Sequence, residues 1–153
     1  MDNAPDRNVP ISLAESGWPR EHAGVSEGHE RAFPVIYVSD VRRSVRFYER
    51  LGFTVRYQHP NDEEPGYVKL TRGPAELGIV HEQSPLDLIG EGKGHGLRFE
   101  LFVYVDDVDA MQAFLGAETR ILREPDDMPW GERIAYVADP DGNPVVLATV
   151  VRP

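Results

Sequence analysis

The stretch that decides the fold covers residues 33–53 and reads Phe-Pro-Val-Ile-Tyr-Val-Ser-Asp-Val-Arg-Arg-Ser-Val-Arg-Phe-Tyr-Glu-Arg-Leu-Gly-Phe. Its first six residues are rich in β-branched and aromatic side chains, which is typical of a half-buried strand. Ser39-Asp40 then supplies oxygens that can cap a helix, apolar residues recur at helical spacing, and Gly52 can end the helix. The stretch therefore predicts a strand, a turn, a helix and a stop.

The same arrangement returns in the second half of the chain. Leu101-Phe-Val-Tyr-Val-Asp-Asp-Val108 repeats the apolar strand and its Val-x-Asp-Val ending. Val38 corresponds to Val105, and at the same offset Phe47 corresponds to Phe114. Because an internal repeat determines the fold, the chain is interpreted as an imperfect duplication.

Each repeat is predicted to hold one helix and four strands, which gives an α+β fold of two β-α-β-β-β modules that form cup-shaped mixed sheets. A helix and a sheet face of this size cannot bury themselves alone, so the modules are expected to stabilise each other. The predicted remaining strands cover residues 54–57, 67–71, 75–80, 120–123, 133–138 and 144–150, with a loop over 125–131. The predicted division is an N-terminal arm (1–31), a first module (32–82), an irregular connector (83–96) and a second module (97–153), in one domain overall.

The composition excludes several classes of function. The 153 residues carry 16 basic and 26 acidic side chains, a net charge of −10, which disfavours nucleic acid and fits a neutral or cationic partner. The absence of cysteine excludes disulfides, thiolate metal sites and a cysteine nucleophile. No apolar run has the length of a membrane span and no signal peptide is visible, so a cytoplasmic protein without a membrane partner is expected.

The N-terminal arm is rich in Pro, Gly, Glu and Ser. One interpretation is a mobile segment. The other is that residues 9–13 or Trp18 dock on the body of the protein or on a neighbouring subunit, as in a partner-binding module.

Three segments together resemble the glyoxalase/bleomycin resistance/extradiol dioxygenase superfamily, which has the vicinal oxygen chelate fold. They are the strand and turn at residues 32–41, Phe-Tyr-Glu-Arg-Leu-Gly-Phe at 47–53, and Pro-Trp-Gly-Glu-Arg-Ile-Ala-Tyr-Val-Ala-Asp-Pro-Asp-Gly-Asn at 129–143. The resemblance covers about residues 32–150. It implies the fold, whereas the function stays open, because this superfamily contains isomerases, dioxygenases, epimerases, thiol transferases and drug-sequestering proteins.

The resemblance also implies four positions at which enzymes of the superfamily hold a divalent metal with His, Glu or Gln. In this chain they fall on Phe33, Glu76, Glu100 and Val146. Phenylalanine and valine offer no lone pairs to a metal, so a catalytic metal is disfavoured. The alternative is a displaced site in which Glu76 and Glu100 recruit His81, Glu82 or His95.

The residues that alternate with these positions share their side of each sheet. Aromatic rings and two carboxylates are therefore expected to line the cup, while Ile36 and Val38 face the core. Pro129-Trp130-Gly131 resembles the segment that borders the drug pocket of bleomycin resistance proteins, which makes Trp130 the strongest stacking candidate. The predicted ligand-binding residues are Trp130, Phe33, Tyr37, Tyr67, Glu76, Glu100, Phe102 and Tyr104.

Two other groups are assigned to structure. The arginines at 42, 43 and 46 are expected to form the solvated face of the helix, and Asp139-Pro-Asp-Gly-Asn143 is expected to be a turn without a catalytic role.

The sequence thus favours a binding protein over an enzyme. The expected function is bleomycin resistance-like sequestration of an aromatic, cationic small molecule such as an antibiotic, by a homodimer with no cofactor and no catalytic residue. The alternatives are a metal-dependent lyase, isomerase or oxygenase of the glyoxalase/dioxygenase type with an atypical ligand set, and an interface role for the aromatic face.

Overall fold

The computed structural model describes residues 32–61, 64–97 and 99–152. The predicted N-terminal arm, with Trp18, lies outside these residues. The described chain forms two compact units. The first contains the residues up to Arg42 together with Thr54–Lys93, and the second contains Arg43–Phe53 and the chain from Gly94 onward.

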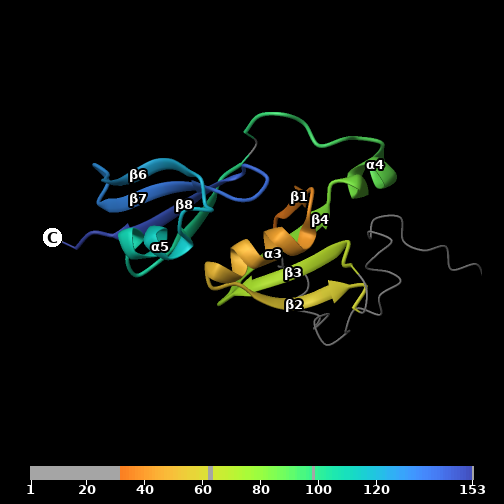
Figure 1. Ribbon diagram of the computed structural model, residues 1–153, viewed down its shortest axis with the longest axis horizontal. Helices are drawn as coiled ribbons and strands as arrows, with labels where there is room; N and C mark the ends of the chain where they lie inside the picture. Colours follow the sequence, from red (N-terminus) through yellow and green to blue (C-terminus); the bar gives the residue numbers. More distant parts are fainter. Residues whose placement is uncertain (1–31, 62–63, 98, 153) are drawn as a thin grey trace, which may run out of the picture. The chain divides into compact units, whose positions relative to one another are not determined.

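The first unit is a four-stranded sheet in the order β1-β4-β3-β2 (Figure 1). Its strands are β1 (Val35–Val38), β2 (Thr54–His59), β3 (Tyr67–Arg72) and β4 (Ala75–His81). β1 runs parallel to β4, whereas β3 is antiparallel to both of its neighbours. A short helix, α4 (Gln83–Ile89), follows β4.

The second unit repeats this topology. Its sheet has the order β5-β8-β7-β6, with β5 parallel to β8 and the other pairs antiparallel. Its elements are α3 (Val41–Arg50) from Arg43 onward, β5 (Leu101–Tyr104), α5 (Val108–Leu115), β6 (Ile121–Asp127), β7 (Glu132–Ala138) and β8 (Pro144–Val150). Two mixed sheets of identical strand order confirm the predicted α+β duplication, while the predicted domain boundaries stay a prediction.

Each first strand is buried on one face only, as its alternation predicts. In β1, Ile36 and Val38 are buried, whereas Tyr37 is 41% exposed. In β5, Val103 is buried and its neighbour Tyr104 is 51% exposed. Each sheet therefore presents an open face that carries aromatic side chains.

The turn at residues 139–143 is confirmed, and it also has a tertiary role in the second unit. Asp139 is buried and accepts hydrogen bonds from the amides of Asp141 (3.0 Å) and Asn143 (2.8 Å). Its other oxygen accepts from the Asn143 side chain and from the hydroxyl of Tyr48 on α3, both at 2.8 Å. Burial and the Asp139 carboxylate raise the pKa of Tyr48 well above its ordinary value.

Two local predictions are wrong. The loop expected at 125–131 begins later, because β6 continues through Pro125 to Asp127. This strand lies at the edge of the sheet and its pairing shifts register twice, which lets a residue without an amide hydrogen remain in the strand. The irregular connector expected at 83–96 contains α4, which has Pro85 in its first turn and the left-handed Gly90 at its end.

None of the helices in the described ranges combines the length and the apolar character needed to cross a membrane. The cytoplasmic location stays a prediction.

Candidate functional site

The open face of the second sheet is the stronger candidate site because it combines exposed aromatic rings with a buried apolar floor. Strand register places Phe102 beside Val146 and Val146 beside Tyr136. The next row runs from Tyr104 through Ala148 to Ile134. Paired residues point to the same side of a sheet, so these two rows form one surface.

The floor of this surface is closed and apolar. Ile134, Val146 and Ala148 form a cluster with at most 2% exposure, and Met128 and Tyr136 pack against it. Val146 occupies one of the positions that the resemblance assigned to a metal ligand, and it is fully buried. The floor therefore backs the side chains that cover it, and it offers no lone pair to a metal at Val146.

Three exposed aromatic rings belong to this unit's candidate surface, Phe102 and Tyr104 on β5 and Trp130 in the turn before β7. Phe102 is 42% exposed and Trp130 is 62% exposed. The rings of Phe102 and Tyr104 are tilted by 36° with their centroids 6.4 Å apart. All three predicted aromatic residues of this unit thus belong to one open surface.

Glu132, which the sequence analysis missed, joins two of these aromatic residues. The hydroxyl of Tyr104 donates to Glu132 Oε1 at 2.6 Å, and the indole Nε1 of Trp130 donates to Glu132 Oε2 at 2.9 Å. These two hydrogen bonds lower the pKa of Glu132, and the bond from Tyr104 raises the pKa of that tyrosine. Glu132 is therefore a carboxylate at neutral pH. One of its oxygens binds the hydroxyl of Tyr104 and the other binds the indole of Trp130.

The backbone around Trp130 is fixed by a tight turn between β6 and β7. The amide of Met128 donates to the carbonyl of Glu132 at 2.7 Å, and the amide of Gly131 donates to the carbonyl of Met128 at 3.0 Å. Gly131 has φ of +92°, a conformation that a residue with a Cβ adopts only under strain. The glycine in Pro-Trp-Gly is thus needed to present the indole from this turn.

A second carboxylate lies on the same sheet. Glu100 was predicted as a site residue, and it accepts a hydrogen bond from Tyr136, a residue that the prediction missed. Burial and the neighbouring Glu100 raise the pKa of Tyr136, and Arg123 opposes this effect. Alternation along β7 could have identified both missed residues, because Glu132, Ile134 and Tyr136 fall on one face.

The open face of the first sheet has different chemistry. Register aligns Tyr37 with Val80 and Val80 with Tyr67, so the two predicted tyrosines lie on the same side. Tyr67 is only 6% exposed, whereas Tyr37 is accessible. The close approach of β1 and β4 requires a glycine, because a Cβ on Gly78 would lie 2.9 Å from Cγ2 of Val35.

A buried ion pair occupies the centre of this face. Lys69 Nζ lies 2.6 Å from Glu76 Oε1, and the lysine side chain is 2% exposed. The same ammonium lies 4.5 Å from the centroid of the Phe33 ring. Glu76 and Phe33, both predicted as site residues, are thus brought together by a lysine that neutralises the carboxylate.

The side chains at the positions implied for a metal do not fit a divalent ion. Val146 is sealed in the apolar floor, Phe33 packs on Lys69, and Glu76 is paired with that lysine. Among the described residues, no group of three or more His, Asp or Glu side chains is arranged to hold a metal ion.

The displaced alternatives lie in other settings. Glu82 pairs with Lys93 at 3.3 Å, and His81 Nδ1 accepts a hydrogen bond from the amide of Gln83. His95 lies in the exposed segment before β5.

The hydrogen bonds that Tyr104 and Trp130 donate to Glu132 predict that the environment of the Trp130 indole changes with pH. Because the folded-state pKa of Glu132 is lowered, its hydrogen bonds are present at neutral pH and are lost as the pH falls through that lowered pKa. We expect the indole N–H resonance of Trp130 to shift in this range in ¹H–¹⁵N spectra. In Glu132→Gln the shift should disappear, and Trp18→Phe identifies the resonance. If the Trp130 resonance still shifted with pH in Glu132→Gln, the hydrogen bond between Trp130 and Glu132 would not be its cause.

The fold agrees with comparisons to known proteins. No curated protein matches the chain. Among solved structures, TioX from Micromonospora sp. ML1 is 22% identical with a TM-score of 0.64, and the match covers 79% of this chain and 100% of that chain. A glyoxalase/bleomycin resistance protein/dioxygenase family enzyme from Burkholderia phytofirmans PsJN is 20% identical with a TM-score of 0.66. The match covers 76% of this chain and 95% of that chain.

A glyoxalase-related enzyme from Fulvimarina pelagi is 23% identical with a TM-score of 0.65, and the match covers 78% of this chain and 87% of that chain. At these identities the structures support the fold alone. The family model described as the Glyoxalase/Bleomycin resistance protein/Dioxygenase superfamily matches residues 31–147. The chain therefore belongs to the glyoxalase/bleomycin resistance protein/dioxygenase superfamily.

Proposed function

We propose that this protein binds and sequesters a flat, cationic aromatic small molecule, in the manner of bleomycin resistance proteins, without a catalytic metal. The observation that carries the proposal is the Tyr104–Glu132–Trp130 arrangement above the apolar floor. A carboxylate between two aromatic rings matches the two parts of such a ligand, because the rings stack on its plane and the carboxylate pairs with its charge.

The side chains on the first sheet support the same proposal. Tyr37 is an exposed ring, while the Lys69–Glu76 pair leaves Glu76 no uncompensated charge to offer a metal. Glu100 and Glu132 leave the second sheet acidic. An antibiotic such as bleomycin, which contains aromatic and cationic groups, is the ligand class that we propose.

We further propose that the protein acts as a homodimer in the cytoplasm and that the partner subunit completes the binding cleft. Open aromatic faces on both sheets support this proposal, because a molecule bound on one exposed sheet face alone would remain largely hydrated. Analytical ultracentrifugation with and without ligand tests it, and a monomer that binds ligand would contradict it.

Trp130→Ala is expected to weaken ligand binding by about tenfold, because a stacked aromatic anchor contributes about 1 kcal/mol or more. Isothermal titration calorimetry with bleomycin and a panel of flat cationic aromatic compounds measures the change. Phe114→Ala is the matched control, since Phe114 is 63% exposed but lies on α5 instead of the sheet face. The proposal predicts that only Trp130→Ala affects binding.

Elemental analysis provides a second, independent test. A stoichiometric divalent metal that is lost in Glu76→Gln and Glu100→Gln, with a chelator-sensitive activity, would overturn the sequestration proposal. It would favour a metal-dependent lyase, isomerase or oxygenase with an atypical ligand set.

A further inference from the structure

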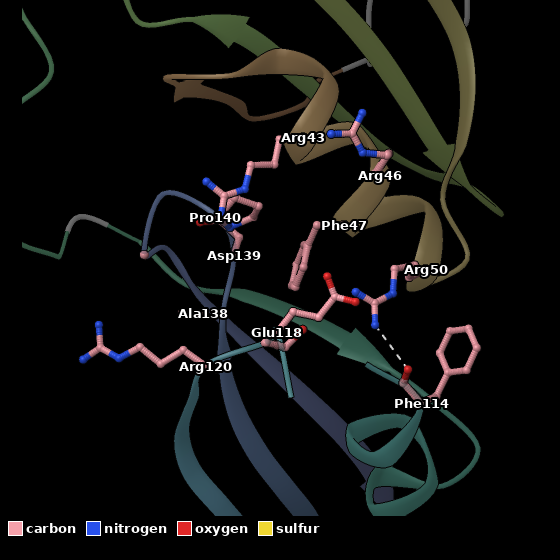
Figure 2. Close-up of a pocket in the computed structure, with 12 residues that line it drawn as sticks. Arg43, Arg46, Phe47, Arg50, Phe114, Glu118, Arg120, Ala138, Asp139 and Pro140 are labelled. Atoms are coloured by element: carbon pink, nitrogen blue, oxygen red, sulfur yellow. Dashed lines mark hydrogen bonds between the residues drawn. The ribbon is translucent and has the colours of Figure 1, made fainter. Parts of the chain in front are cut away.

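We propose that the second unit contains a separate site for a multiply charged organic anion, at a cavity of about 670 Å³ beside α3. Figure 2 shows three arginines of α3, Arg43, Arg46 and Arg50, around this cavity, with Arg120 at a different edge. Four arginines thus line one cavity in a chain whose net charge is −10. Guanidinium groups bind phosphate and carboxylate with paired, charge-assisted hydrogen bonds.

Helix geometry explains why these arginines converge. Residues at spacings of three and four lie on one face of a helix, so 43, 46 and 50 share a stripe. Arg42, which precedes this stripe, is not among the residues that line the cavity and forms an ion pair with Glu64 at 2.5 Å. The sequence analysis assigned Arg42, Arg43 and Arg46 alike to a solvated face, whereas the cavity separates the last two from the first.

Arginines outnumber acids among the residues that line the cavity, with four arginines against Asp139 and Glu118. Asp139 accepts four hydrogen bonds from neutral donors, which satisfy its oxygens. Within the part of the chain that the structure describes, no carboxylate forms a salt bridge with Arg46 or Arg120. Glu118 is the other acid among the lining residues.

The cavity also has an apolar part. Phe47 projects from α3 between the arginines (Figure 2), and the exposed Phe114 lies on α5. Arg50 is held in place because it donates to the carbonyls of Phe114 and Leu115, with its guanidinium 5.9 Å from the Phe114 ring. The volume suits a small molecule, so the ligand class is a phosphate or polycarboxylate anion with an apolar or aromatic body.

The site differs from the proposed drug-binding surface in location and charge. Its residues come from α3, α5, the segment 118–120 before β6, the end of β7 and the 139–143 turn, whereas the aromatic surface is built on the open face of β5, β7 and β8. The two sites can therefore be tested independently.

Calorimetry at low ionic strength with pyrophosphate, citrate and ADP tests the proposal on the full chain. Pyrophosphate against citrate separates phosphate from carboxylate recognition. Arg46→Gln and Arg120→Gln are each expected to weaken binding of the preferred anion by about tenfold, since each removes charge-assisted hydrogen bonds. Glu118→Gln is expected to strengthen it, because a repelling charge is removed. Phe114→Ala should weaken the binding of ADP more than the binding of pyrophosphate if the Phe114 ring contacts the organic part of the ligand.

Arg42→Gln is the matched control, because it removes the same charge from the same helix outside the cavity. The proposal requires Arg42→Gln and Trp130→Ala to retain wild-type anion affinity. Equal losses in Arg42→Gln and Arg46→Gln would show nonspecific charge attraction and overturn the site. The absence of saturable binding of all three anions would overturn it as well.

Discussion

Asp139→Ala is expected to lower the free energy of unfolding by about 4 kcal/mol, because it leaves several buried hydrogen-bond donors without an acceptor. The Asp139 carboxylate is 4% exposed and accepts four hydrogen bonds, three from its own turn and one from Tyr48. Urea unfolding followed by circular dichroism measures the loss. In a chain of this size the melting temperature should fall by roughly 10 °C.

Asp126→Ala is the control for this substitution. Asp126 pairs with Arg123 at 2.9 Å, but both side chains are more than half exposed. Exposed pairs contribute less than about 1 kcal/mol. If Asp139→Ala lost no more stability than Asp126→Ala, the turn would not anchor α3.

Tyr48→Phe measures how much of this stability loss comes from the hydrogen bond between Tyr48 on α3 and Asp139 in the turn. In a double-mutant cycle, Tyr48→Phe and Asp139→Ala should be coupled by about 1 kcal/mol or more. The raised folded-state pKa of Tyr48 adds a pH signature. The contribution of Tyr48 to the free energy of unfolding is present below the pKa of about 10 that a tyrosine has in the unfolded chain. It is lost as the pH rises toward the higher pKa of Tyr48 in the folded protein. Tyr48→Phe should therefore reduce the alkaline loss of stability.

Lys69→Met is expected to destabilise the protein by about 3 kcal/mol, because it leaves the carboxylate of Glu76 without its counter-charge in a largely buried setting. The Glu76 side chain is 20% exposed, so water compensates for part of the loss. Chemical denaturation of Lys69→Met, Glu76→Gln and the double variant measures the free energy by which the Lys69–Glu76 ion pair stabilises the fold.

The double variant distinguishes a lost ion pair from lost packing. Because both charges are removed, Lys69→Met/Glu76→Gln should recover most of the stability lost in Lys69→Met alone. Arg123→Gln, which breaks an exposed pair, should change stability by less than about 1 kcal/mol. A double variant as unstable as Lys69→Met would contradict the electrostatic explanation.

The candidate site depends both on local sequence patterns and on contacts between distant residues. The sequence predicts that Phe102 and Tyr104 share one face of a strand, because alternation is a property of the backbone, and both are exposed on β5. It also identified Trp130, because a tryptophan between proline and glycine has no obvious place in a core. It missed Glu132, whose role depends on two hydrogen bonds to residues that lie on a different strand or in the preceding turn.

The sequence by itself determined the duplication, the alternating strand faces and the 139–143 turn, since each follows from local periodicity, local side-chain chemistry or repetition. Tertiary structure decided the partners of the charged side chains. Lys69 meets Glu76 because strand pairing brings β3 and β4 side by side, and Tyr48 meets Asp139 because α3 lies beside the 139–143 turn. Such contacts join residues far apart in the chain, so no local pattern specifies them.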